Sequence, residues 1–192
     1  MTRIIAGELG GRRIAVPPRG TRPTTDLVRE AIFGRLDAAD AVRRANVLDA
    51  FAGSGALGIE ALSRGAAHAP FVEAAAPAAA VISRNLRDLG LVDQGAVVRA
   101  KVASFLARSG EEFTLALLDP PYDLPPADLA ATLAALAPRL AVGAQVVLEW
   151  SSRGADPGWP PGIVPLLVRR YGETSVHFAH AETGSPGGTL DS

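Results

Sequence analysis

The chain has no cysteine among its 192 residues, which excludes disulfide bonds and metal sites built on thiolates. Its three histidines, His68, His177 and His180, are scattered along the sequence and do not resemble a metal site, so we expect no bound metal. A run of about 18 apolar residues, the length that a membrane-spanning helix needs, is also missing. The first residues lack the apolar core of a signal peptide. We therefore expect a cytoplasmic protein with no membrane association.

A strong excess of one charge is missing as well, because the formal net charge is −1. The charges are nevertheless unevenly distributed: residues 1–45 contain nine arginines against five acids, and the remainder is acidic. A basic leading segment is typical of a surface that meets phosphate. A solvated basic terminus is the alternative interpretation. The candidate phosphate-binding residues in this segment are Arg3, Arg12, Arg13, Arg19 and Arg22.

What the sequence does contain is a regular alternation of short apolar runs with helical segments. This alternation predicts an α/β fold with a doubly wound, mostly parallel sheet. The last two predicted strands are joined only by Gly172 and Glu173, which is too short for a parallel crossover, so this pair must be antiparallel. We predict strands at 46–50, 69–73, 95–100, 114–119, 144–150, 163–171 and 174–179, and helices at 26–36, 56–64, 76–89, 102–108 and 126–140.

A small extension is expected in front of this sheet. Residues 3–6 and 12–16 are β-like runs separated by glycines, and they predict a hairpin that is too small for a core of its own. A loop rich in proline and arginine follows, and Thr24 or Thr25 can cap the next helix. We therefore divide the chain into an N-terminal arm (1–25), one globular domain (26–181) and a flexible polar tail (182–192).

The stretch 46–58, NVLDAFAGSGALG, joins a buried strand to a helix through a glycine turn. Gly53 and Gly55 permit positive φ and a close approach to a ligand, and the helix start offers backbone N–H groups to a polar ligand group. A tight turn without a ligand has the same glycines, so the pattern alone is weak. It makes five residues candidates for cofactor binding: Asp49, Ala52, Gly53, Ser54 and Gly55.

Three acids follow successive strands of the predicted sheet. Asp49, Glu73 and Asp119 all stand at carboxyl ends, and in a doubly wound sheet these ends share one crevice where ligands bind. Glu73, 24 residues after Asp49, suits an acid that accepts hydrogen bonds from the ribose hydroxyls of a nucleoside cofactor. The alternative for Glu73 is a surface carboxylate that ends a strand.

The most specific motif is Asp119-Pro120-Pro121-Tyr122. Two prolines remove two backbone donors and hold the chain extended, so neighbouring carbonyls can accept from a ligand. Asp119 adds a carboxylate acceptor, and Tyr122 adds a flat aromatic face. Acceptors beside a stacking ring suit an exocyclic amino group on a planar base, so these four residues are the candidate catalytic group. A rigid turn that caps a strand is the alternative.

Together, D-P-P-Y and D-x-F-A-G-S-G-A-L-G resemble class I S-adenosylmethionine-dependent methyltransferases that act on amino groups. The leading stretch 3–33, with R-P-T-T-D-L-V-R-E, is more specifically similar to the bacterial RsmD family. The resemblance continues through EALSRGA (60–66), FVE (71–73), NLRDLGL (85–91) and RRYGET (169–174), so it covers nearly the whole chain to about residue 179. Members of this family methylate a guanine N2 in 16S ribosomal RNA.

The resemblance implies roles for the candidate residues. The glycine turn would hold the methionine end of S-adenosylmethionine, and Glu73 its ribose. Asp119 and the Pro120 carbonyl would accept from guanine N2, and Tyr122 would stack on the base. One departure concerns the adenine contact, where the family usually has an acid and this chain has its only lysine, Lys101. A backbone carbonyl or Ser104 would substitute there, and Thr25 completes the predicted cofactor set.

The resemblance also implies a partner, either 16S ribosomal RNA or a small-subunit assembly particle, with the arginine-rich arm as the RNA-binding surface. We expect a monomer. Two alternatives stay open from the sequence. One is a methyltransferase for adenine N6 of DNA or for a protein glutamine, although those enzymes usually begin the proline motif with asparagine. The other is a catalytically silent RNA-binding factor in ribosome assembly.

Overall fold

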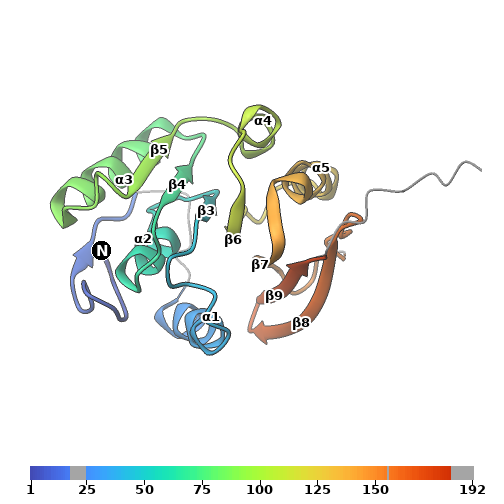
Figure 1. The fold of residues 1–192 in the computed structure, drawn as a ribbon, viewed down its shortest axis with the longest axis horizontal. Coiled ribbons are helices and arrows are strands. Elements are labelled where there is room, and N and C mark those ends of the chain that lie inside the picture. The colour runs from blue at the N-terminus through green and yellow to red at the C-terminus, as the bar shows by residue number, and fades with distance from the viewer. Residues whose placement is uncertain (18–24, 155, 183–192) are drawn as a thin grey trace, which may run out of the picture.

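A seven-stranded sheet forms the centre of the computed structural model, which describes residues 1–17, 25–154 and 156–182. Its strand order is β5-β4-β3-β6-β7-β9-β8 (Figure 1). The predicted doubly wound α/β fold is confirmed, because β3, β4, β5, β6 and β7 pair in parallel. The strands are β3 (Val47–Ala50), β4 (Ala69–Val72), β5 (Gly95–Val98), β6 (Phe113–Leu118), β7 (Leu140–Ser151), β8 (Ile163–Tyr171) and β9 (Thr174–Ala181).

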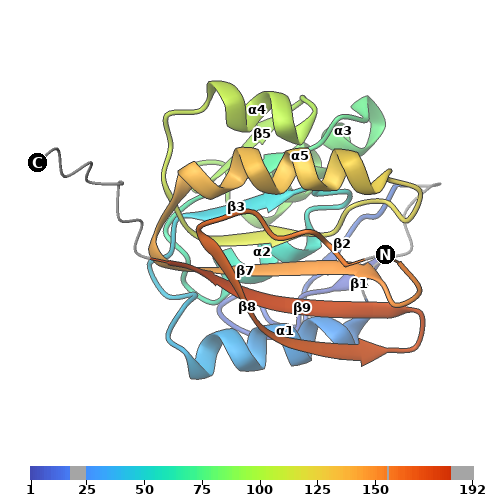
Figure 2. The same cartoon turned by 90° about the vertical axis from the view of Figure 1, so that its right-hand side faces the viewer.

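Helices cover both faces of the sheet, and each face has its own apolar core. On one face, side chains of α1, α2 and α3 pack against strand residues such as Val47, Phe71 and Leu117. On the other, α4 and α5 pack against Leu48 and Leu118, and Figure 2 shows α1 and α5 on opposite sides. The helices are α1 (Asp26–Ala38), α2 (Ala56–Ser63), α3 (Ala76–Leu89), α4 (Val102–Arg108) and α5 (Pro126–Leu136).

The last strand of the chain lies inside the sheet rather than at its edge. β9 pairs antiparallel with β7 on one side and with β8 on the other, which confirms the predicted antiparallel pair. Gly172 turns the chain between β8 and β9 with a φ of +63°, a backbone conformation that glycine adopts without strain. β8 is therefore the edge strand although it precedes β9 in sequence.

One predicted helix is too long. The pattern predicts a helix at 126–140, but α5 ends at Leu136 and a short 3₁₀ turn, Ala137–Arg139, follows. Pro138 has no N–H to continue the helical ladder. The next strand, β7, therefore begins at Leu140 instead of at 144.

The N-terminal segment is joined to the main core, which the sequence analysis did not foresee. Its hairpin is short, with β1 (Thr2–Arg3) antiparallel to β2 (Arg13–Ile14). Ile4 and Ile14 are each only 2% exposed and belong to the same core as α1, α2 and α3. The segment is too short to form a core of its own, and it packs against the core of the main domain instead.

Buried polar side chains fix the backbone of this segment. The Glu60 carboxylate, which is fully buried on α2, accepts from the N–H groups of Ile5 at 2.7 Å and Ala6 at 3.0 Å. Asn85 on α3 exchanges two hydrogen bonds with the backbone of Ala15, at 2.9 and 3.0 Å. Buried Arg29 donates to the Arg3 carbonyl at 2.7 Å. Each bond satisfies a backbone N–H or carbonyl group of this segment.

In the described ranges, every helix falls short of the length and apolarity needed to cross a bilayer.

Candidate active site

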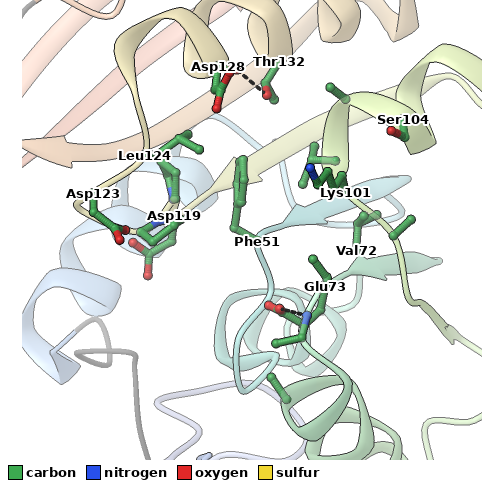
Figure 3. Close-up of a pocket in the computed structure, with 18 of the residues that line it drawn as sticks. Phe51, Val72, Glu73, Lys101, Ser104, Asp119, Asp123, Leu124, Asp128 and Thr132 are labelled. Carbon is green, nitrogen blue, oxygen red and sulfur yellow. Dashed lines mark hydrogen bonds between the residues drawn. The ribbon is translucent and has the colours of Figure 1, made fainter.

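A cavity of about 870 Å³ opens at the carboxyl ends of the parallel strands, where a doubly wound sheet places its ligands. Loops after β3, β4, β5 and β6 contribute to it, together with α4 and the first half of α5 (Figure 3). Its polar and charged lining residues are Glu73, Lys101, Ser104, Asp119, Tyr122, Asp123, Asp128 and Thr132.

The strand register brings the predicted acids to one level. Ala50 of β3 pairs with Val72 of β4 and with Leu118 of β6. Glu73 and Asp119 are the next residues after those two partners, so they flank the residue that follows Ala50. The structure therefore brings these two acids to the same cavity.

The residue between them is Phe51, which the sequence analysis did not identify as part of the site. It lines the cavity, and in Figure 3 it stands between Glu73, Lys101 and Ser104 on one side and Asp119 and Asp123 on the other. Its φ of +60° is uncommon for a bulky residue and costs conformational energy. Phe51 therefore stands in the cavity in a conformation that the surrounding structure has to stabilise.

Glu73 is held in place from both of its oxygens. Oε2 accepts from the N–H of Gly53 at 2.9 Å, and Oε1 accepts from the N–H of Ala75 at 2.7 Å. Each carboxylate oxygen has a further lone pair, so the group can still accept from a ligand. The bond to Gly53 also couples the glycine turn to the cavity.

Asp49 is used differently, because it is buried behind the glycine turn and does not line the cavity. Its Oδ2 accepts from the N–H of Gly58 at 2.9 Å. Burial raises the pKa of Asp49 well above its usual range, the Gly58 bond opposes this, and the nearby charges of Asp119 and Glu73 raise it further. Of the three strand-end acids that were predicted to share one crevice, Glu73 and Asp119 line the cavity and Asp49 does not.

Glycine is required in this turn for its conformation and in the first turn of α2 for space. Gly53 and Gly55 have φ values of +55° and +78°, which confirms the expected positive φ. At Gly58, a Cβ atom would lie 2.4 Å from the Phe71 ring and 2.8 Å from Asp49 Oδ2. A side chain at 58 would therefore push away the carboxylate that the helix binds.

The D-P-P-Y motif follows β6 and forms one wall of the cavity. The Pro121 carbonyl accepts from the N–H of Leu124 at 2.9 Å, which closes the turn after the motif. Tyr122 is 53% exposed at the mouth, and its hydroxyl bonds to the Thr174 hydroxyl at 2.5 Å. The ring is thus anchored at its outer end to the β8–β9 hairpin while it remains accessible.

The charge of the cavity favours a cationic ligand. Four carboxylates line it, and Lys101 is the only basic side chain among the described lining residues.

Helix α5 contributes two polar residues to the lining, and Thr132 Oγ1 donates to the Asp128 carbonyl at 2.8 Å. Asp128 and Thr132 were not predicted, although a polar pair four residues apart on an apolar helix is a usable signal. A sulfonium or an amino group would be stabilised in this environment.

Six predicted cofactor residues lie outside the lining of the cavity. Thr25 caps α1 by accepting from the N–H of Val28 at 3.3 Å, and Asp49 binds Gly58. Residues 52–55 do not line the cavity, although Gly53 donates to Glu73, which does. Their contacts with a cofactor stay predictions.

Two of the predicted RNA-binding arginines have partners within the protein. Arg3 pairs with Asp26 at 2.9 Å, and Arg12 donates to the Asp88 carbonyl at 2.8 Å. Arg13 is exposed. Arg19 and Arg22 lie outside the described residues, as does most of the predicted tail. Folding therefore accounts for part of the basic charge in this segment.

Comparisons with known proteins agree with this architecture. The family described as conserved hypothetical protein 95 matches residues 2–180. The Escherichia coli ribosomal RNA small subunit methyltransferase D is 44% identical over 121 residues, which are 62% of this chain and 60% of that protein. The chain thus aligns with less than two thirds of that relative's length.

Solved structures extend the likeness over nearly the whole chain. The Escherichia coli protein YhhF superposes with a TM-score of 0.83 at 34% identity, covering 95% of this chain and 99% of that one. The magnesium protoporphyrin IX methyltransferase of Synechocystis, solved with S-adenosylmethionine bound, has a TM-score of 0.65 at 15% identity, covering 81% and 79%. At that identity it supports the fold alone.

Proposed function

The chain belongs to the family described as conserved hypothetical protein 95, and from that premise we propose that it transfers a methyl group from S-adenosylmethionine to the exocyclic N2 of a guanine in small-subunit ribosomal RNA. The observation that carries the proposal is the convergence of Glu73 and the D-P-P-Y motif on one cavity. The name of the Escherichia coli relative, a ribosomal RNA small subunit methyltransferase, supports the substrate class.

The cavity residues fit S-adenosylmethionine by charge and by hydrogen bonding. Glu73 would accept from the ribose hydroxyls, because its carboxylate is aligned by two backbone N–H groups and retains lone pairs. The carboxylates of the lining suit a sulfonium and an amino group. When bound, the cofactor supplies an electrophilic methyl carbon.

The residues after β6 would hold the base. Asp119 and the Pro120 carbonyl would accept the two hydrogens of the exocyclic amine, which favours a nitrogen whose lone pair points at the methyl carbon. The cofactor would supply the methyl group and keep the sulfur as the leaving group, and Asp119 would receive the proton that the amine loses. Tyr122, accessible at the mouth, would stack on the base, which must leave its own stack to enter. Positioning supplies much of the rate.

The N-terminal segment would guide RNA to this mouth. Pro17, at the end of the described part of this segment, lines the cavity. Ala15, two residues before it, accepts from the side chain of Asn85, which also donates to the Ser54 carbonyl at 3.0 Å. One amide thus ties the arm to the glycine turn. Arginine suits this task because its guanidinium binds phosphate in a fork and stacks on bases. Such a substrate implies action in the cytoplasm.

Methyl transfer from tritium-labelled S-adenosylmethionine tests the proposal. The purified protein should label unmethylated small-subunit ribosomal RNA or the assembling particle, and digestion should release N2-methylguanosine. Label in adenine of DNA, or in a protein glutamine, would instead support the alternative substrates. If the cofactor binds but no substrate class is labelled, the silent RNA-binding alternative would replace this proposal.

A further inference from the structure

Two adjacent arginines near the end of β8, Arg169 and Arg170, belong to the stretch RRYGET (169–174), which the methyl-transfer proposal leaves without a role. Both side chains are exposed. Within the described ranges of the chain, neither side chain forms an ion pair or a hydrogen bond. Contacts in those ranges therefore do not account for the two charges, and a guanidinium group in this situation can bind phosphate from outside the chain.

The sheet topology places these arginines at the same end of the molecule as the cavity. β9 is antiparallel to both β7 and β8, so β8 runs in the same direction as β7 and as the strands that end at the cavity. The carboxyl end of β8 therefore lies at the end of the sheet where Glu73 and Asp119 follow their strands. Figure 1 shows β8 and β9 on the far side of the sheet from the N-terminus.

The tip of the β8–β9 hairpin is fixed to the wall of the cavity. The Thr174 hydroxyl bonds to the hydroxyl of Tyr122, a lining residue, at 2.5 Å. Ser152, which follows β7, donates from its N–H to the Glu173 carbonyl at 2.9 Å and from its hydroxyl to the Gly172 carbonyl at 3.1 Å. A group that binds at the end of the hairpin would therefore have a defined position relative to the Tyr122 ring.

The charge of the cavity restricts which part of an RNA strand can enter it. Four carboxylates line the cavity, so they would repel a phosphate, whereas an uncharged base can enter. A strand that inserts one base must therefore keep the neighbouring phosphates outside, on a basic surface. The exposed Arg13 of the N-terminal segment is one candidate for this task. The hairpin arginines are a second candidate, on the other side of the mouth.

We propose that the end of the β8–β9 hairpin, with Arg169 and Arg170, is a second RNA-binding surface that holds phosphates next to the inserted base on the side of Tyr122. The inference rests on the proposed function, because it takes RNA as the substrate. Arg169 pairs with Val176, which packs in the core beside α1, and Arg170 points to the opposite face because side chains alternate along a strand. The strand end thus presents a guanidinium group on each face, one for each of two phosphates.

An alternative use for the two charges is to prevent the edge strand β8 from pairing with other chains. The double variant Arg169→Glu/Arg170→Glu separates the two uses, because it keeps the edge charged but repels phosphate. In filter binding with unmethylated small-subunit ribosomal RNA, the slope of log affinity against log salt should fall by about 1.4–1.8, the share of two phosphate contacts. The Kd for S-adenosylhomocysteine should stay unchanged.

The matched control is Arg43→Glu/Arg44→Glu. This pair of arginines is also adjacent and exposed, but it precedes β3 and so lies at the opposite end of the sheet from the cavity. The control should keep the wild-type slope, and equal slopes for the two double variants would overturn the inference. Loss of methyl transfer to the assembling particle with an unchanged slope on RNA would also overturn it, because the hairpin would then meet a protein. If the wild type neither binds nor methylates RNA, the proposed function fails together with the inference.

The absence of cysteine permits a second test, of location. Glu173→Cys, at the exposed turn of the hairpin, can carry a single iron chelate that cleaves nearby RNA with hydroxyl radicals, and Arg43→Cys with the same chelate is the control. Cuts from position 173 should fall within a few nucleotides of the guanine that the protein methylates, and position 43 should give none there. Cuts from position 173 that lie only far from that guanine would overturn the inference, while methylation of the same guanine would leave the proposed function intact.

Discussion

Glu60 and Glu73 both accept hydrogen bonds from two backbone N–H groups, yet their surroundings differ. Glu60 is fully buried, and its Oε1 also accepts from the Arg64 guanidinium at 2.8 Å. Glu73 lines the cavity, where its remaining lone pairs face the space that a ligand would fill. Bonds to backbone N–H groups alone therefore do not distinguish a structural acid from a binding acid.

The same contrast separates two regions of the molecule. Around Glu60, the N-terminal segment and α2 form a closed contact in which polar groups serve folding. Around Glu73 and Asp119, the strand ends form an open site whose charges face a cavity. Substitutions in the closed region should therefore lower stability, whereas substitutions in the open region should lower binding or catalysis.

The largest effect is expected in the open region, at Asp119. Asp119→Ala should reduce methyl transfer by about a thousandfold, because removing one preorganised partner of a reacting group costs on the order of 10²–10³ in rate. Cofactor affinity should stay within several-fold, since the proposal places Asp119 at the base and not at the cofactor. Transfer of tritium to RNA and calorimetry measure the two quantities. Asp123→Ala, in the same loop and also lining the cavity, is the control, and wild-type turnover in Asp119→Ala would refute the assignment.

The closed region should respond to Glu60→Ala with a loss of about 3 kcal/mol in the free energy of unfolding, because the Arg64 charge and two backbone donors lose their partner. We take the lower end of the usual range because Arg64 also pairs with Asp37. Denaturant titration measures the loss. Glu30→Ala, an exposed glutamate on α1, should change stability little. Equal stability of the two variants would contradict the closed-contact interpretation.

Glu73→Ala tests the open half of the comparison directly. The affinity for S-adenosylhomocysteine should fall roughly tenfold to a hundredfold, since a hydrogen bond to a charged group contributes about 1.5–3 kcal/mol. Glu73→Gln keeps an acceptor, so its affinity should lie between that of the wild type and that of Glu73→Ala. Thermal unfolding of each variant separates this effect from the loss of the bonds to Gly53 and Ala75. An unchanged dissociation constant would make Glu73 a surface carboxylate.

Asp49 lies between the two regions, and its variant should show a smaller effect that depends on pH. Because burial raises the pKa of Asp49, its contribution to stability is fully present below about pH 4, the ordinary aspartate pKa, and is lost as the pH rises through the raised value. Asp49→Asn stays neutral and can still accept from Gly58. It should gain stability over the wild type at neutral pH, and the gain should vanish in acid. Exposed Asp93→Asn is the control for a difference that does not depend on pH.

The smallest effect is expected at Arg13. Arg13→Glu should weaken RNA binding and reduce the slope of log affinity against log salt by about 0.7–0.9, the share of one phosphate contact. Arg43→Glu, at an exposed arginine that precedes β3 and so lies at the opposite end of the sheet from the cavity, should leave the slope unchanged. Equal slopes for both variants would remove Arg13 from the RNA surface.

The elements of the sheet and its helices could be predicted because local signals, such as a glycine after a helix, mark their ends. Gly90 ends α3 with a φ of +74°, and α3 and α4 have the predicted bounds. The alternation of strands and helices predicts a parallel sheet, and a parallel sheet brings the acids that follow its strands to one edge. For the site, this reasoning identified Glu73 and Asp119 as lining residues, and the D-P-P-Y motif added Tyr122.

Other features depend on contacts that no local pattern contains. Phe51 reads as an apolar residue in a turn, and neither its left-handed backbone nor its place in the cavity is visible in the local pattern. The fixation of the N-terminal segment depends on Glu60 and Asn85, which are separated from their partners by 54 or more residues. Their polar side chains on helices are indistinguishable in sequence from solvent-exposed ones.

The position of β9 has a consequence for how the chain is made. β7 is complete at Ser151, but the strand that pairs with its outer edge, Thr174–Ala181, is synthesised after β8. At a translation rate of about 5–20 residues per second, the edge of β7 waits on the order of seconds for its neighbour, and β8 has no place in the sheet until β9 arrives. A nascent chain interrupted between Tyr171 and Ala181 would expose the apolar β7 edge, which is a template for pairing with other chains. The sheet therefore cannot be completed before the last of these strands has been translated.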